Sequence, residues 1–145
     1  MYTHILLPTD GTPSSKDAIQ KCMRFAKALN AKVTGLHVVP QYHMFSYQPE
    51  MMEDTSDKFA KECEAQAQRY LSEIELEAKE LRVDCSTLTL TNDHPYEAII
   101  QAAEKQGCDL IAMASHGRKG IKALLLSSET QKVLAHSKIP VLVYR

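Results

Sequence analysis

The sequence lacks both a strong net charge and a long apolar run. Its 145 residues carry 17 Lys and Arg against 18 Asp and Glu, which leaves a formal net charge of −1 at pH 7. Charges of both signs are interspersed, so no basic stripe is present that would attract nucleic acid or anionic lipid. No apolar segment approaches the length of a membrane span, and no charged region precedes an apolar segment at the N-terminus. We therefore expect no nucleic-acid or membrane partner and a cytoplasmic location.

Paired cysteines are also missing. The four cysteines show neither a C-x-x-C pair nor a histidine at zinc-ligand spacing, and they stand at Cys22, Cys63, Cys85 and Cys108. Zinc sites and dithiol redox motifs need such spacings. We interpret the four as reduced thiols that serve ordinary packing.

Several nucleotide motifs of enzymes are absent as well. The sequence contains neither the phosphate loop G-x-x-x-x-G-K-[ST] nor the dinucleotide fingerprint G-x-G-x-x-G. The segment Thr9–Pro13 lacks the glycine pair of an S-G-G-x-D-S pyrophosphatase loop. A dehydrogenase is therefore not expected, and no base is evidently aimed at a water molecule. We predict no catalytic residues and at most slow ATP hydrolysis.

What the sequence does contain is a regular alternation of strand and helix patterns. Five strands are expected at 4–8, 32–39, 83–91, 108–115 and 139–144. Four helices are expected between them, from the cap residues at 12–15 to Asn30, over 56–81, over 96–106 and from Ser128 onward. The segment 40–54 has no steady periodicity and is expected to form a long loop.

This alternation predicts an α/β fold in a single domain that spans residues 1–145. We expect a five-stranded, mostly parallel sheet with helices on both faces, Rossmann-like, in the strand order 3-2-1-4-5. Ligands of such sheets bind beyond the carboxyl ends of the strands, where the strand order reverses. The segments 8–10 and 113–117 should therefore converge on one crevice.

A run of small residues follows the fourth predicted strand. Met113 to Gly120 leads into Ser127 and Ser128, where the last helix is expected to start. Free N–H groups and the dipole of a helix N-terminus favour an anion. Ser128 also begins an S-x-x-Q pattern, so we expect it to cap this helix. The run predicts a nucleotide site.

These residues resemble the universal stress protein family. That family has an opening strand that ends in P-[TV]-D and a late loop G-x2-G-x9-G-[ST]. Here Pro8–Asp10 matches the first element, and Ala114-x2-Gly117-x9-Ser127-Ser128 occupies the second. The resemblance covers essentially the whole chain, including the closing strand.

The resemblance implies a stress-response protein that holds ATP or AMP, with or without Mg²⁺, and chooses partners according to the nucleotide. It implies that Asp10 bonds the ribose or helps to place the metal, that the backbone at Val38 meets the adenine edge, and that Met113 lies against the base. The other implied contacts surround the ribose and phosphates. The full predicted set is Pro8, Thr9, Asp10, Val38, Met113, Ala114, His116, Gly117, Arg118, Ser127, Ser128 and Glu129.

Several of the implied contacts have a structural alternative. Asp10 with Gly11 could form only a turn and a helix cap, and Arg118 could be a solvated surface residue. Two of the three family glycines are replaced, by Ala114 and Ser127, and a Cβ there could obstruct a phosphate. The alternative function is therefore a nucleotide-free dimeric interaction module of the stress response.

The last predicted strand, Ile139–Tyr144, is a nearly continuous apolar run. In the expected order it lies at a sheet edge, where unpaired backbone groups recruit another strand. Pattern and resemblance both predict a homodimer in which two copies pair these edges antiparallel. Its interface would contain Ile139, Val141 and Val143. The alternative is an edge that Pro140 and flanking charges protect.

Overall fold

The computed structural model describes residues 1–41, 52–116 and 126–145, with side chains of the second range described from residue 56. Its strands are β1 (His4–Pro8), β2 (Lys32–Val39), β3 (Cys85–Thr91), β4 (Leu110–Ala114) and β5 (Val141–Tyr144). Its helices are α1 (Pro13–Leu29), α2 (Met52–Leu81), α3 (Pro95–Lys105) and α4 (Ser128–His136). Strands and helices alternate along the chain, as predicted.

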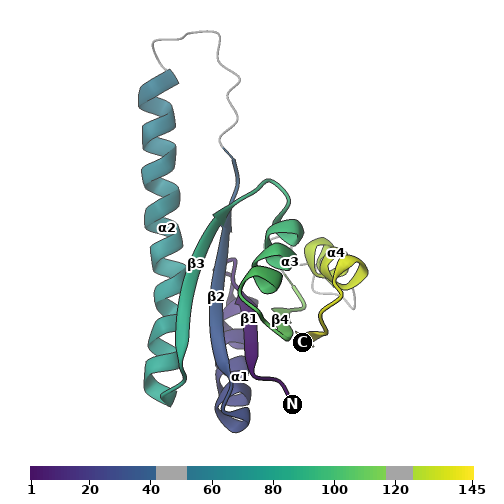
Figure 1. The fold of residues 1–145 in the computed structure, drawn as a ribbon. Coiled ribbons are helices and arrows are strands. Elements are labelled where there is room, and N and C mark those ends of the chain that lie inside the picture. The colour runs from purple at the N-terminus through teal and green to yellow at the C-terminus, as the bar shows by residue number, and fades with distance from the viewer. Residues whose placement is uncertain (42–51, 117–125) are drawn as a thin grey trace.

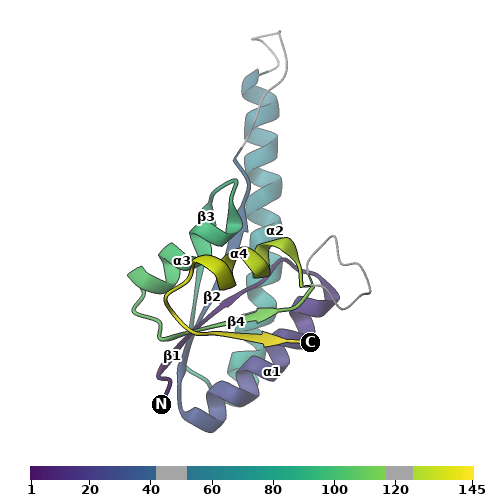
Figure 2. The ribbon, with the colours of Figure 1, turned by 90° about the vertical axis from the view of Figure 1, so that its right-hand side faces the viewer.

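The five strands form one sheet in the order β3-β2-β1-β4-β5. Figure 1 shows β3, β2 and β1 side by side, and Figure 2 shows the last strand, in yellow, beside β4. Every strand pair in it is parallel. The chain first builds outward from β1 to β3 and then crosses back to add β4 and β5, so the order reverses between β1 and β4. The predicted fold class and strand order are confirmed.

Two apolar clusters lie on opposite faces of the sheet. Alternate residues of β1 separate them, because Ile5 and Leu7 join one cluster and Leu6 joins the other. The first cluster contains Ile74 of α2 together with residues of α1, and the second contains residues of α3 and α4. Helices therefore cover both faces, α1 and α2 on one and α3 and α4 on the other.

Several element boundaries differ from the sequence-based expectation. The helix α2 begins at Met52, so it includes residues that were expected in the preceding loop. Val83 is not part of β3, because its N–H donates to the Ala78 carbonyl, 2.9 Å away, and closes the end of α2. The strands β4 and β5 are shorter than expected, and Ile139 precedes β5 in a turn that the Ser137 hydroxyl holds.

The first helix begins and ends as the pattern predicts. The Thr12 side chain accepts a hydrogen bond from the Ser15 N–H, and Pro13 occupies the first turn. Asn30 ends the helix in a left-handed conformation with φ of 54°. No helix in the described ranges is long and apolar enough to cross a membrane.

The four cysteines are all free. Burial raises the pKa of the Cys22 thiol to about 12 and the pKa of the Cys85 and Cys108 thiols to about 11. These three thiols therefore stay protonated near neutral pH, and they pack as small apolar groups.

Candidate functional site

The candidate site lies where the strand order reverses, at the carboxyl ends of β1 and β4. Two segments far apart in sequence meet the same edge of the sheet there, residues 9–12 after β1 and residues 115–116 after β4. The N-terminus of α4 lies beside the second segment, because the Ser127 N–H donates to the Ser115 carbonyl oxygen, 2.8 Å away. The two segments share one sheet edge, as predicted, and their meeting in one crevice stays a prediction.

The loop after β1 is held from both sides. The buried Thr9 donates its N–H to the Leu36 carbonyl oxygen, 2.8 Å away, which extends the pairing with β2. His37 is 6% exposed, and its ring places Nδ1 at 3.0 Å from the Thr9 carbonyl oxygen. The loop therefore leaves the sheet in a fixed direction.

Asp10 is the centre of a small hydrogen-bond network at the start of α1. Its Oδ1 accepts from the Thr12 N–H at 3.0 Å, from the Thr12 hydroxyl at 2.7 Å and from the Ser15 hydroxyl at 2.7 Å. Oδ1 therefore forms the predicted turn, while the Thr12 side chain caps the helix. No donor among the described residues reaches Oδ2, so this oxygen can still accept from a ligand.

Gly11 lets the loop pass directly beneath a tyrosine ring of α2. Its φ of +79° lies in the left-handed region, and a Cβ there would overlap the Tyr70 ring. The Tyr70 ring in turn meets the His37 ring edge to face, with centroids 5.1 Å apart. The sequence suggested a turn at Gly11, but the partner from α2 carries no sequence signal.

Next to the end of β4 lies a buried hydroxyl that meets no partner within the part of the chain that the structure describes. Ser115 is 2% exposed, its N–H donates to the Tyr144 carbonyl oxygen, and its carbonyl oxygen accepts from the Ser127 N–H, both at 2.8 Å. Its Oγ meets no hydrogen-bond partner among the described residues. A buried hydroxyl without a partner is costly unless something else binds it. Sequence reasoning missed Ser115, although it lies inside the predicted loop.

The cap of α4 is Ser127 and not Ser128 as predicted. The Ser127 hydroxyl accepts from the Thr130 N–H at 3.2 Å and lies 2.7 Å from the Thr130 hydroxyl. The Thr130 hydroxyl also donates to the Ala114 carbonyl oxygen at 3.1 Å, which ties α4 to β4. Ser128 is the first helical residue and its side chain is exposed.

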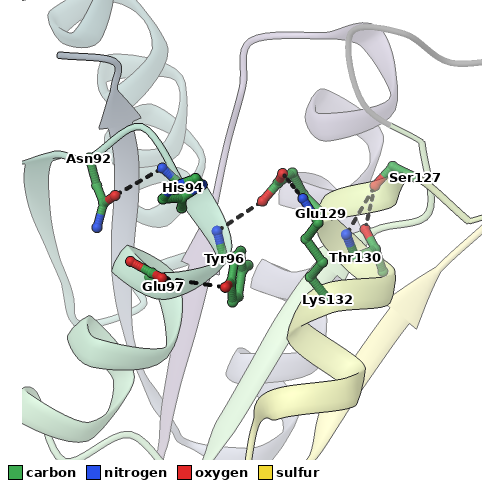
Figure 3. A network of polar contacts seen from close by, with 8 residues as sticks. All are labelled: Asn92, His94, Tyr96, Glu97, Ser127, Glu129, Thr130 and Lys132. Atoms are coloured by element: carbon green, nitrogen blue, oxygen red, sulfur yellow. Dashed lines mark hydrogen bonds and ion pairs between the residues drawn. The ribbon is translucent and has the colours of Figure 1, made fainter.

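Glu129, in the first turn of α4, contacts the neighbouring helix α3. Its Oε2 accepts from the Tyr96 N–H of α3 at 2.9 Å, and its Oε1 lies 3.6 Å from Lys132 Nζ (Figure 3). The Lys132 ammonium also lies over the Tyr96 ring, 5.6 Å from its centroid. The structure thus gives Glu129 a hydrogen bond that joins α4 to α3, and its contact with a nucleotide stays a prediction.

The remaining predicted residues are placed as follows. Met113 is 6% exposed and belongs to the cluster beneath α3 and α4, and Val38 packs half-buried against the same cluster. Pro8 ends β1 opposite Leu36, and His116 is half-buried. Gly117 and Arg118 lie outside the described residues. Within the described ranges, no group of three or more His, Cys, Asp or Glu could hold a metal ion.

Two of the predicted dimer residues, Val141 and Val143, lie in the edge strand β5, whereas Ile139 precedes that strand. Val141 and Val143 are half-buried in β5, which pairs with β4 on one side. The carbonyl oxygens of Pro140 and Tyr144 accept from β4. Since backbone groups alternate sides along a strand, those of Val141 and Val143 point away from β4.

The wholly parallel sheet and its reversal between β1 and β4 define a doubly wound α/β protein, with two loops at the position where this class binds ligands. The chain belongs to the universal stress protein family, whose model matches residues 1–145. The resemblance carried by Pro8–Asp10 and by the Ala114 to Ser128 loop is therefore confirmed at the level of the family.

Individual relatives agree with this assignment. The chain is 30% identical over 145 residues to universal stress protein MJ0531 of Methanocaldococcus jannaschii, which covers 100% of this chain and 83% of the relative. The solved structure of MJ0577 from that organism is similar with a TM-score of 0.83 and 28% identity, over 99% of this chain and 95% of the other. A universal stress protein in complex with cAMP shares the fold, with a TM-score of 0.71 and 24% identity over 99% of this chain and 97% of the other.

Proposed function

We propose that this chain binds an adenine nucleotide, ATP or AMP, at the carboxyl edge formed by β1 and β4. The observation that carries the proposal is the buried Ser115 hydroxyl, which meets no hydrogen-bond partner among the described residues. The backbone of Ser115 contacts the N-terminus of α4 through the Ser127 N–H. A phosphate oxygen there would accept from this hydroxyl and from the first N–H groups of the helix. A related universal stress protein in complex with cAMP supports an adenine ligand.

The donors and acceptors at this edge suit the two ends of a nucleotide. Among the described residues, the N–H groups of Ser128 and Glu129 meet no acceptor, and they are the donors left for a phosphate. Asp10 keeps Oδ2 for a ribose hydroxyl or for the Mg²⁺ that accompanies ATP. Mg²⁺ would arrive with the phosphates, because a single carboxylate is a weak resident site.

The proposed role is in the stress response, through a partner that recognises the nucleotide-bound form. The proposed assembly is a homodimer that pairs β5 with β5 of a second copy, since the outward backbone groups of Val141 and Val143 are available for it. We place this activity in the cytoplasm, where ATP and AMP are present and four free thiols stay reduced.

A nucleotide-free interaction module is the second candidate, and one observation favours it. The Ser127 hydroxyl already accepts from the Thr130 N–H, which a family glycine would leave open for a phosphate. One of the free N–H groups at the N-terminus of α4 therefore already has an acceptor within the chain. The two candidate functions differ in whether the remaining N–H donors of α4 are sufficient to bind a phosphate.

Isothermal titration of the purified chain with ATP, ADP and AMP, with and without Mg²⁺, tests the proposal. We expect saturable binding at or below millimolar concentration, and Ser115→Ala should weaken it about three- to ten-fold because a hydrogen bond is lost. The same variant should unfold at no lower urea concentration than the wild type, since the removed hydroxyl has no partner in the described residues.

Ser72→Ala is the matched control, because that hydroxyl lies on the exposed surface of α2 and, among the described residues, bonds only the Gln68 carbonyl oxygen, 2.6 Å away. Its nucleotide affinity should equal that of the wild type. A wild type that binds none of the three nucleotides at millimolar concentration would refute the proposal in favour of the nucleotide-free module.

A further inference from the structure

An acidic side chain is unexpected in the first turn of a phosphate-binding helix. Glu129 is the second residue of α4, next to the N–H groups that a phosphate would approach. A carboxylate at this place competes with the phosphate for the positive end of the helix. The chain could relieve this competition by extending the side chain into solvent, but the structure shows it bound elsewhere.

The N-terminus of α3 requires the Glu129 carboxylate. The residue that caps this helix, His94, makes no side-chain hydrogen bond to it, and Pro95 has no N–H to donate. The first N–H that needs an acceptor is therefore that of Tyr96, and Glu129 Oε2 supplies it at 2.9 Å (Figure 3). Releasing the carboxylate would leave this donor without a partner.

The negative charge of Glu129 is thus held in the first turn of α4, near the helix N-terminus. The positive charge of Lys132 compensates it only in part. Lys132 Nζ lies 3.6 Å from Oε1, but 48% of its side chain is exposed, so water weakens this ion pair. The Glu129 side chain is 34% exposed, so its charge is screened less than in bulk water. Each negative charge that a ligand brings to this edge meets the same fixed carboxylate.

We propose that Glu129 sets the phosphate charge that the site accepts, so that an adenosine monophosphate is favoured over the triphosphate. The proposal rests on the proposed nucleotide site. It assigns Glu129 as a specificity determinant that acts by repulsion, while its hydrogen bond to α3 keeps the repulsive group in place. At separations of about 8 Å and an effective dielectric constant of about 40–80, each added ligand charge weakens binding on the order of two- to six-fold.

Glu129→Gln tests the repulsion directly. The variant keeps an amide oxygen that can accept from the Tyr96 N–H, and it removes the charge. We expect the ratio of the ATP to the AMP dissociation constant to fall on the order of ten-fold, measured by isothermal titration at low salt without Mg²⁺. Glu104→Gln is the matched control, since it removes the same charge from the far end of α3, and its ratio should equal that of the wild type.

Glu129→Asp separates charge from helix capping. Its shorter side chain keeps the charge but withdraws from the Tyr96 N–H, so the unfolding midpoint should fall while the ratio stays within about two-fold of the wild type. An unchanged ratio in Glu129→Gln, or an equal shift in Glu129→Asp, would overturn the assignment and leave the nucleotide site standing. A wild type and variants that bind neither nucleotide would overturn this assignment together with the proposed function.

Discussion

Replacing Gly11 by alanine should destabilise the protein by about 2–4 kcal/mol. The backbone there has φ of +79°, which costs a residue with a Cβ about 1 kcal/mol. The new Cβ would also stand 2.6 Å from Tyr70 Cδ1 and closer still to Cε1 and Cζ. The ring cannot move freely, because it packs against His37 and its hydroxyl accepts from Gln66 Nε2 at 2.8 Å. Overpacking of this kind costs about 1–3 kcal/mol more.

Gly107→Ala separates the cost of the backbone conformation from the cost of the clash with Tyr70. Gly107 has a similar φ of +70°, but a Cβ there would meet nothing within 4 Å. This variant should therefore lose only about 1 kcal/mol, the cost of the backbone conformation. Urea unfolding followed by circular dichroism gives the free energy of unfolding for both variants.

The double variant Gly11→Ala/Tyr70→Ala completes the test. Without the ring, alanine at position 11 should cost no more than alanine at Gly107, so the two substitutions should show a coupling of about 1–3 kcal/mol. Equal losses for Gly11→Ala and Gly107→Ala, or the same Gly11→Ala loss with and without the ring, would refute the steric argument.

Three further predictions concern the edge strand, the pH dependence and the altered loop. Val141→Pro should convert a dimer into a monomer in sedimentation equilibrium, because it removes an outward backbone donor without touching the pairing with β4; a wild type that is monomeric at tens of micromolar contradicts it. Burial lowers the pKa of His4 below its usual 6.5. The free energy of unfolding should therefore be highest, as far as His4 is concerned, above about pH 6.5, and it should fall as the pH drops from there toward the lowered pKa. His4→Gln should flatten that part of the curve of unfolding free energy against pH. Glycine at both Ala114 and Ser127 should maintain or tighten nucleotide affinity in titration calorimetry, and weaker binding with unchanged folding would show that the two side chains contribute.

The sheet and its order could be predicted because they depend on patterns that the chain repeats. Alternation of apolar runs and amphipathic segments fixes the sequence of elements, and parallel pairing with right-handed crossovers leaves few arrangements. The predicted boundaries of helices and strands were less accurate. Val83 has a strand-like side chain, but its N–H completes the last turn of α2. The apolar pattern alone cannot reveal such a hydrogen bond.

The candidate site could be predicted only in outline. The position of the two loops follows from the topology, but two adjacent serines made the start of α4 ambiguous, and hydrogen bonds select Ser127. Contacts between distant elements carry no local signal. Glu129 meets the Tyr96 N–H 33 residues away, and Tyr70 covers Gly11 from α2. Both depend on how helices pack on the sheet.

The network around Asp10 has a consequence for the recognition of a sugar. Oδ1 already accepts three hydrogen bonds from Thr12 and Ser15, so a ribose would meet this carboxylate at Oδ2 alone. Two neighbouring sugar hydroxyls would then converge on one oxygen in a forked contact and would not each take an oxygen of their own. Loss of one of these hydroxyls removes one hydrogen bond to Oδ2 and leaves the other in place. This chain should accordingly distinguish ribose from deoxyribose less sharply than a carboxylate with two open oxygens.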